Sequence, residues 1–298
     1  MKRKLLAVAL MAVVALTGCA NSDLNSEESA AVYPLTLTDT YGHEVTIEEE
    51  PQTIVTVSPA LTEIVYALDA QDKLAGRSDY DDYPEAVFDI QAVGPIDMPD
   101  VELIVSLNPD VVLASSIFSE EAYNAITEAG IPVVIINDES SLSAMPAYVS
   151  TVADVIGKHD EGAAMAEDLT NQLETIAQDG TGVTVYYCMG YGEYGDYTAG
   201  GDTFINDIIE TAGCVNIASD VEGWMYSTEA LLANDPDIIL VPSWGADYFL
   251  ETEPYNNLTG TVVAIDANLF ERVGPRNIEA IQVIIDAAAE LNSVDAAA

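Results

Sequence analysis

Aromatic and cationic side chains recur in this sequence directly after short apolar runs. Seven of them are candidates for contact with a ligand: Tyr80, Tyr83, Tyr191, Tyr197, Trp224, Arg272 and Arg276. Tyrosine and tryptophan rings cover broad, partly apolar ligand faces, and a guanidinium group pairs with a carboxylate or a phosphate. The carboxyl ends of parallel strands meet at one edge of a sheet, where α/β proteins bind ligands. We therefore expect these side chains to form one aromatic-lined cleft for a bulky ligand that carries an anionic group.

Basic residues are scarce, which gives weight to each of them. The chain of 298 residues has 8 Lys and Arg against 51 Asp and Glu, a formal net charge of −43 at pH 7. Arg77, Arg272 and Arg276 follow predicted strands, and we interpret them as contacts for an anionic group on the ligand, with ion pairs to nearby carboxylates as the alternative. The same negative field opposes binding to nucleic-acid phosphates, and we expect no nucleic-acid partner.

Patterns typical of catalysis are missing from the sequence. His43 and His159 are the only two histidines, in a predicted turn and at a predicted helix start, and no Gly-x-Ser-x-Gly occurs. We therefore expect no enzyme activity, no catalytic cofactor and no metal site built by the protein. A secreted α/β hydrolase is the alternative from a different class, and it requires a pair of nucleophile and base.

The elements that position the candidate residues form βα units. Short apolar runs at 53–57, 110–114 and 132–136 are each followed by a helical pattern, which predicts parallel strands with helices between them. Before these runs, residues 33–48 predict a β-hairpin that turns near Tyr41-Gly42. The predicted fold class is α/β.

A repeat divides this pattern into two halves. The segment from Glu102 to Leu113 matches the segment from Glu229 to Leu240 at an offset of 127 residues, and each predicts a helix, a Pro-Asp stop and a buried strand. Two pseudo-symmetric α/β lobes are expected, at residues 33–156 and 180–298. Residues 157–179 keep helical spacing, and we expect a long rigid helix there that joins the lobes and limits hinge closure.

The N-terminus has the layout of a secretory signal. Three basic residues at positions 2–4 precede an apolar run at 5–16, which closes on LTGC (16–19) and resembles the lipobox of bacterial lipoproteins. We expect a signal peptide at 1–18, a lipidated Cys19 and a flexible tether at 19–32. Without residues 1–18, five basic residues face 51 acidic ones, a net charge of −46 that suits either a saline habitat or a lineage-wide composition. For Cys188 and Cys214, a disulfide and two buried free thiols both stay open.

Together these residues resemble a known family, the helix-linked (class III) substrate-binding proteins of ABC importers for vitamin B12, haem and ferric siderophores. The resemblance covers residues 33–292 and is carried by SPALTE (58–63), YxxYP (80–84), Val93-Gly94, both Glu-to-Pro-Asp repeats, YTAGG (197–201) and ERVGPR (271–276). It implies two α/β lobes with the ligand between them, and it is closest to the cobalamin-binding branch.

The resemblance also implies roles for single residues. In the cobalamin-binding branch, positions matching Tyr80, Tyr191, Tyr197 and Trp224 surround the corrin, and one matching Arg272 lies at its polar edge. Glu102 and Glu229 match carboxylates that dock onto arginines of the permease, and two ordinary surface glutamates are the alternative. The sequence departs from the branch at Ile96, where that branch has a stacking tryptophan.

Charge ranks the possible ligands. A ferric catecholate carries about three negative charges and is repelled by this protein, whereas a corrinoid has little net charge, a broad face for rings and one phosphate for an arginine. Haem stays an alternative, because Tyr83 or Tyr80 offers an axial ligand and Arg272 can meet a propionate. Neutral hydroxamate siderophores are not repelled by the negative charge, so they also stay possible ligands.

The predicted protein is a non-catalytic, monomeric receptor. It is extracytoplasmic, anchored to the cell membrane by a lipid, and delivers a corrinoid, or alternatively haem or a ferric siderophore, to an ABC permease dimer with its ATPase. An adhesive surface lipoprotein without a small ligand is a further alternative, and it requires that the rings of Tyr80, Tyr197 and Trp224 are scattered over the surface.

Overall fold

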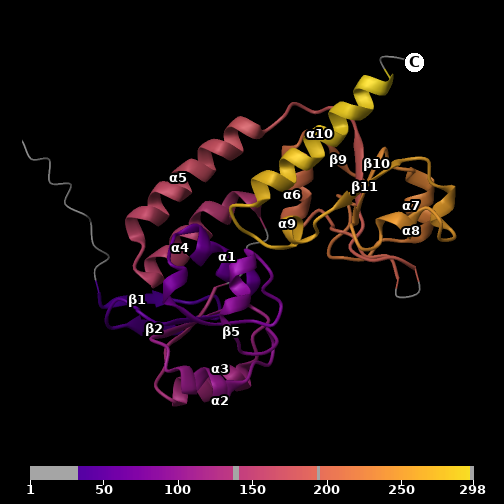
Figure 1. Cartoon of the computed structure of the whole chain (residues 1–298). Helices are drawn as coiled ribbons and strands as arrows, with labels where there is room; N and C mark the ends of the chain where they lie inside the picture. The colour runs from indigo at the N-terminus through magenta and orange to yellow at the C-terminus, as the bar shows by residue number, and fades with distance from the viewer. Residues whose placement is uncertain (1–32, 137–140, 193–194, 296–298) are drawn as a thin grey trace, which may run out of the picture.

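The structure is a computed structural model that describes residues 33–136, 141–192 and 195–295, and it shows two α/β lobes with a long helix between them (Figure 1). The signal peptide, the tether and Cys19 lie outside the described residues. No helix in the described part of the chain is long and apolar enough to cross a membrane.

The first lobe contains, in chain order, β1 Leu35–Thr38, β2 Glu44–Ile47, β3 Ile54–Val57, α1 Pro59–Ala67, β4 Leu74–Arg77, β5 Gln91–Ala92, α2 Val101–Leu107, β6 Val111–Ala114, α3 Glu120–Glu128, β7 Val133–Ile135 and α4 Met145–Ile156. Helix α5, His159–Ile176, follows. The second lobe contains β8 Thr184–Tyr187, α6 Phe204–Thr211, β9 Val215–Asn216, α7 Thr228–Asn234, β10 Ile238–Pro242, α8 Ala246–Phe249, β11 Thr261–Ile265, α9 Asn268–Glu271 and α10 Asn277–Asp295.

Each lobe is built on one parallel sheet, as the alternating pattern predicted. The strand order is β5-β4-β3-β6-β7 in the first lobe and β11-β10-β8-β9 in the second. Every residue of β3, β6, β7 and β10 is buried, because helices cover both faces of a parallel sheet. The predicted hairpin is also present, as the antiparallel pair β1 and β2. Its turn is joined to β7, since the Thr40 amide donates to the Ile135 carbonyl at 3.0 Å.

The sequence repeat is a structural repeat. Helices α2 and α7 begin at capping residues Asp100 and Ser227, whose side chains accept hydrogen bonds from the third amide of the helix. Both helices end in a left-handed residue, Asn108 with φ 48° and Asp235 with φ 42°. The next aspartate of each copy anchors a neighbouring strand: Asp110 accepts the Thr53 amide at 2.8 Å, and Asp237 accepts the Thr184 amide at 2.8 Å.

One hydrophobic core is shared by the two lobes. It contains Leu61 and Ile64 of α1 together with Phe270 and Ile281 from the second lobe. Two smaller cores lie on the outer sides, one between the first sheet and helices α2 and α3, the other around β10 and α8. Because the shared core must be disrupted before the lobes can swing apart, the arrangement favours a stiff molecule.

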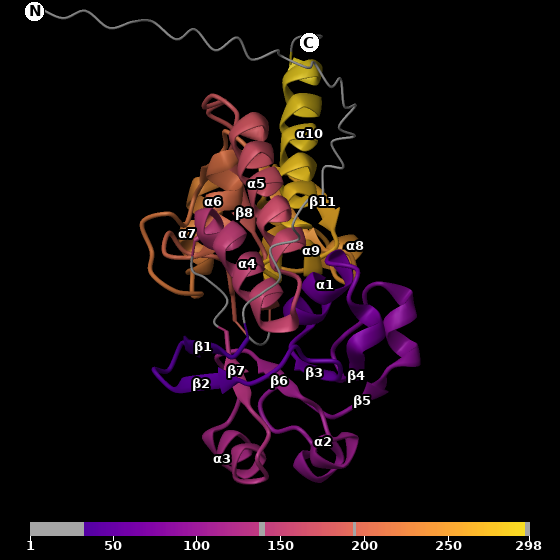
Figure 2. The same cartoon turned by 90° about the vertical axis from the view of Figure 1, so that its left-hand side faces the viewer.

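Helix α5 is held tightly against α4. The turn between them needs a left-handed residue, which Gly157 supplies with φ 80°. At Gly162 a β-carbon would lie 2.1 Å from the β-carbon of Ala153, so only glycine permits this close approach of the helices. Helix α5 lies side by side with α10, the last helix of the second lobe (Figure 2). The expected helix between the lobes is therefore packed against both α4 and α10.

Candidate ligand-binding cleft

A cavity of about 320 Å³ lies between the lobes. Its first-lobe wall is formed by the residues that follow β3, β4 and β6, and its second-lobe wall by residues of α9 and the segment after it. The lining residues are Ser58, Pro59, Ala60, Tyr80, Ile96, Ser115, Ser116, Ile117, Asn268, Glu271 and Arg272. The cavity thus lies at the carboxyl ends of the first-lobe strands, where the βα pattern predicted a ligand crevice.

Arg272 reaches from the second lobe to the first. Its Nη1 donates to Glu63 Oε1 and to Asp82 Oδ1, both at 2.7 Å. Its Nη2 donates to the Tyr80 carbonyl oxygen at 3.2 Å. Burial lowers the pKa of Arg272, but the hydrogen bonds to Asp82 and Glu63 outweigh that effect and raise it. The guanidinium group therefore stays charged and joins the lobes at the cavity wall.

Arg276 makes a second connection between the lobes. Its guanidinium carbon lies 3.8 Å from the centre of the Tyr83 ring, a cation–π contact. Its nitrogens lie 3.3 Å from Glu63 Oε2 and 3.2 Å from Asp266 Oδ2. In this structure Arg272 and Arg276 are both engaged in ion pairs, the alternative that the sequence left open. A ligand anion at either arginine must share it with these carboxylates or displace them.

The carboxylates in this network are partly or fully withdrawn from solvent. The side chain of Glu63 is 8% exposed; burial raises its pKa, and the two arginines act in the opposite direction. Nearby, Asp81 is 1% exposed and accepts a short hydrogen bond from the Ser78 hydroxyl. Burial raises the pKa of Asp81. These groups give the first-lobe side of the cleft a negative character that complements the two arginines.

Arg77 makes contacts within the first lobe and is not among the residues that line the cavity. It is 8% exposed. Its Nε donates to the Val87 carbonyl at 3.1 Å, and its Nη1 donates to the Ser78 carbonyl at 2.7 Å. Its guanidinium carbon lies 5.4 Å from the centre of the Phe88 ring. These contacts fix the segment that carries Tyr80 and Tyr83.

The predicted aromatic residues are only partly brought together. Tyr80 lines the cavity and is 58% exposed, whereas Tyr83 lies under Arg276 and is 45% exposed. Tyr191 packs inside the second lobe: its ring lies 4.9 Å from Phe249, and its hydroxyl donates to the Gly245 carbonyl at 3.0 Å.

Tyr197 and Trp224 belong to adjacent segments of the second lobe. Tyr197 is half-buried and pairs with Gly190 and Met225 in isolated antiparallel bridges. The amide of Thr198 donates to the Trp224 carbonyl at 2.9 Å, and Trp224 is 41% exposed. These contacts all lie within the second lobe.

Two further exposed side chains also lie shortly after strands, and the sequence analysis did not single them out. Trp244 lies two residues past β10 and is 71% exposed, and Ile117 lies three residues past β6, is 61% exposed and lines the cavity. The run of apolar residues before each of them was the available signal. Tyr248 of α8, the helix that follows β10, is 63% exposed.

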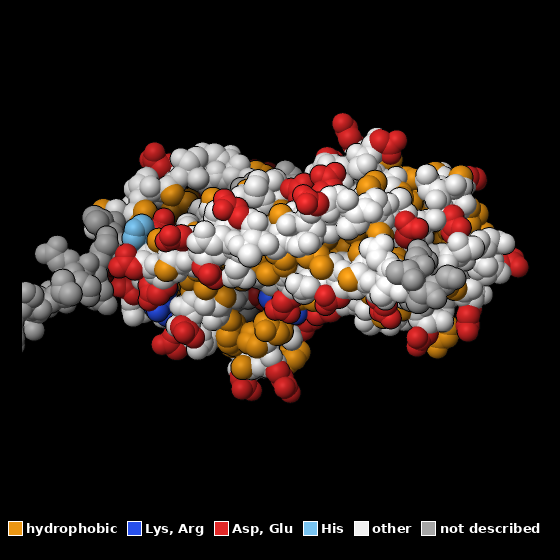
Figure 3. Space-filling view, turned by 90° about the horizontal axis from the view of Figure 1, so that it is seen from above, with side chains coloured by type: hydrophobic (Ala, Val, Ile, Leu, Met, Phe, Trp, Pro, Cys, Tyr) orange, Lys and Arg blue, Asp and Glu red, His pale blue; other side chains and the backbone are white. Residues whose placement is uncertain are grey.

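The two glutamates implied to dock onto a permease occupy equivalent places. Glu102 and Glu229 are the second residues of α2 and α7, and both are exposed. Acidic side chains are spread over much of the surface, while basic ones form only small patches on the face that Figure 3 shows. It is their equivalent position in the repeat, and not their charge, that distinguishes these two glutamates.

Neither Cys188 nor Cys214 lines the cavity. Cys188 and Cys214 are both buried free thiols, and burial raises the pKa of Cys188 to about 12. Across the described ranges, no group of three or more His, Cys, Asp and Glu side chains is arranged to hold a metal ion.

Comparisons with known proteins agree with this architecture. A family model described as periplasmic binding protein matches residues 54–260. The uncharacterized ABC transporter substrate-binding lipoprotein YvrC of Bacillus subtilis is 29% identical over 298 residues, covering 94% of this chain and 95% of the relative. A cobalamin-binding protein of Halobacterium salinarum is 27% identical over 274 residues, covering 85% of this chain and 73% of the relative. The periplasmic heme-binding protein HutB of Vibrio cholerae has a similar fold, with a TM-score of 0.72 and 21% identity over 79% of this chain and 98% of that one.

Proposed function

The chain belongs to the periplasmic binding protein family, and we propose that it captures a corrinoid outside the cell and delivers it to an ABC permease dimer with its ATPase. The observation that carries this proposal is the cavity at the strand ends, with Tyr80 and Arg272 on opposite lobes. A ring and a guanidinium group on facing walls suit a broad molecule with one anionic group. The protein acts by binding and release, without catalysis.

The size of the cavity limits how a corrinoid is held. About 320 Å³ encloses only part of so large a molecule, so the remainder lies against exposed side chains around the opening. Trp244 and Ile117 are exposed apolar candidates for that contact, and Ile96 offers an aliphatic wall inside the cavity. The cobalamin-binding relative of Halobacterium salinarum supports this choice of ligand.

Haem is the second candidate ligand. The hydroxyl of Tyr80 belongs to a side chain that is 58% exposed in the cavity wall, where a haem iron can be ligated by a tyrosine. Arg272 lies beside it and can pair with a propionate once a carboxylate partner is displaced. The likeness to a heme-binding protein in fold is consistent with this alternative.

Isothermal titration of the mature chain with cobalamin, haem and a neutral ferric hydroxamate siderophore tests the ligand. We expect one saturable site for cobalamin with a Kd of about 1 μM or lower. Saturable binding of haem alone would replace the corrinoid, and no binding of any of the three would reject the proposal.

Delivery to the permease is tested separately. The lobes are proposed to span 33–156 and 180–298, joined by 157–179, with Glu102 and Glu229 as their docking carboxylates. The double variant Glu102→Ala/Glu229→Ala should abolish uptake in cells while cobalamin affinity stays unchanged. Glu128→Ala, which removes an exposed glutamate of α3, is the matched control and should transport normally.

Attachment to the membrane is the remaining part of the proposal. Residues 1–18 are proposed to be a signal peptide, Cys19 to carry the lipid and residues 19–32 to be the tether, so that the receptor acts as a monomer at the cell surface. Cys19→Ser should move the protein from the membrane fraction to the soluble extracytoplasmic fraction. A variant that stays with the membrane would contradict this anchor.

A further inference from the structure

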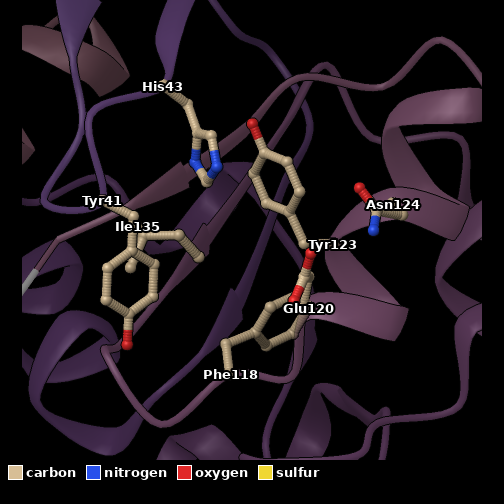
Figure 4. Close-up of a pocket in the computed structure, with 7 residues that line it drawn as sticks. All are labelled: Tyr41, His43, Phe118, Glu120, Tyr123, Asn124 and Ile135. Carbon is tan, nitrogen blue, oxygen red and sulfur yellow. The ribbon is translucent and has the colours of Figure 1, made fainter.

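A second cavity, of about 440 Å³, lies in the first lobe and shares no lining residue with the cleft. It lies where the turn between β1 and β2 meets β7 and the start of α3. Figure 4 shows side chains of Tyr41, His43, Phe118 and Tyr123 arranged around a common space, with Ile135 beside them. Nothing proposed for the cleft uses this pocket.

The aromatic rings of the pocket are fixed in place by contacts within the protein. The His43 and Tyr123 rings are stacked with their centres 4.3 Å apart and their planes 21° apart. The Tyr41 ring meets the His43 ring edge to face at 6.4 Å. Tyr41 is 56% exposed, yet its hydroxyl donates a short hydrogen bond to the Ser116 carbonyl. A ligand would thus find the rings already oriented, which lowers the entropic cost of binding.

The buried carboxylate of Asp39 holds the turn that carries Tyr41 and His43. Asp39 Oδ1 accepts the amides of Tyr41 at 3.0 Å and His43 at 2.8 Å, and Oδ2 lies 2.8 Å from His43 Nδ1. The side chain of Asp39 is 0% exposed. Because a carboxylate oxygen accepts hydrogen bonds, His43 Nδ1 is the donor in this contact. Burial, with a contribution from the Asp39 charge, raises the pKa of the Tyr123 hydroxyl, so this charge is felt across the pocket.

The pocket wall carries negative charge, and His43, the basic side chain in its lining, is already paired with Asp39 at 2.8 Å. Glu120 adds an exposed carboxylate to its wall. Within the described ranges, the salt bridges of Lys73, Lys158, Arg272 and Arg276 all involve carboxylates elsewhere in the molecule. An anionic ligand is therefore repelled here. A metal ion is disfavoured as well, because no cluster of three or more His, Cys, Asp and Glu side chains occurs in the described part of the chain.

We propose that this pocket is a second ligand site, which binds a bulky organic cation bearing an alkylated ammonium group. Tyrosine and phenylalanine rings attract such cations through their faces, and the carboxylates of Asp39 and Glu120 add a complementary field. A volume of about 440 Å³ holds a small molecule rather than a bare monovalent ion. The site does not depend on the function proposed for the cleft.

The test is a calorimetric titration of the mature chain with choline in sodium phosphate buffer that contains about 1 M NaCl. At that ionic strength the Debye length is about 3 Å, so diffuse attraction to the acidic surface is suppressed. We expect one saturable site for choline. Its uncharged carbon analogue, 3,3-dimethylbutan-1-ol, should bind at least about 10-fold more weakly.

Variants assign the binding to the pocket. Tyr41→Leu removes an exposed ring and should weaken choline binding by about 3- to 30-fold, and Glu120→Gln should weaken it less. Tyr248→Leu removes an exposed tyrosine of α8 and should leave the affinity unchanged. Circular dichroism shows whether each variant is folded.

Three outcomes would overturn the proposal. They are the absence of saturable choline binding at about 50 mM, equal affinity for the uncharged analogue, and unchanged affinity in folded Tyr41→Leu. Cobalamin titrated into the same preparations reports on the cleft, whose lining is separate, so failure of one site is distinguishable from failure of the other.

Discussion

The two lobes repeat one unit of helix, left-handed turn and strand, but they contribute different side chains to the ion pairs that join them. The first lobe supplies Glu63 and Asp82, whereas the second supplies Arg272 and Arg276. The repeated unit, with Asp110 and Asp237 in equivalent roles, lies away from these contacts. The comparison teaches that the scaffold is symmetric, while the loops that meet at the cleft are specialised for each other.

The hydrophobic cores also include parts that belong to one lobe and a part that both lobes share. Each lobe has a small core of its own on its outer side, but one large core runs through both on the side of α1 and α10. The ion pairs at the cleft therefore reinforce an interface that apolar packing already makes. We expect the ion pairs to set the fine alignment of the cavity walls and the shared core to set the overall stiffness.

The largest loss of stability is expected from a substitution of Glu63, which pairs with both arginines of the other lobe. Glu63→Ala should lower the free energy of unfolding by about 2–3 kcal/mol, because two partly buried guanidinium groups lose a shared carboxylate. Urea denaturation measures the change. Asp82→Ala is the matched control: the Asp82 side chain is 47% exposed, so its loss should cost less than about 1 kcal/mol. Equal losses in the two variants would show that the position of Glu63 between the arginines has no special importance.

A smaller loss of stability is expected from substitutions in the repeated unit, where the two lobes are alike. Asp110→Ala and Asp237→Ala each remove hydrogen bonds from a carboxylate to the start of a neighbouring strand, and each should cost about 1–2 kcal/mol. Urea denaturation of both variants gives the comparison. Asp89→Ala, which removes an exposed aspartate at the end of the short 3-10 helix Glu85–Asp89, serves as the reference. If one variant lost stability and the other did not, the two copies of the repeat would not be equivalent.

The smallest effect concerns the buried Asp81 on the first-lobe side. Burial raises its pKa in the folded state above the unfolded value, so folding takes up a proton. Its contribution to stability is complete below the unfolded pKa and is lost as the pH rises through the folded pKa. Asp81→Asn should therefore flatten the dependence of the urea midpoint on pH above about pH 4. An unchanged slope would show that the carboxyl of Asp81 does not titrate in this range.

Much of the scaffold could be predicted from the sequence because it follows local periodicity. The alternation of apolar runs and helical patterns located β3, β6 and β7, and the offset of 127 residues located α2 and α7. The apolar spacing after Gly157 likewise located α5. These features depend on residues close together in the chain.

The cleft was harder to predict, since its contacts join distant segments. Arg272 and Glu63 are 209 positions apart, and only the folded chain shows that they form an ion pair. Tyr191 had the expected place after a strand, but its ring packs against Phe249. Trp244 was missed although it follows a strand, because its loop contains none of the motifs that drew attention elsewhere.

A fluorescence titration tests most directly whether both lobes hold one ligand between them. The only two tryptophans, Trp224 and Trp244, lie in second-lobe loops, so a strongly absorbing corrinoid in the cleft should quench their emission. We expect saturation at one equivalent of cobalamin, with about 10-fold weaker binding in both Tyr80→Ala and Trp244→Ala, one from each lobe. Quenching that rises without saturation to about 100 μM cobalamin, or equal affinity in both variants and the original chain, would contradict a ligand held between the lobes.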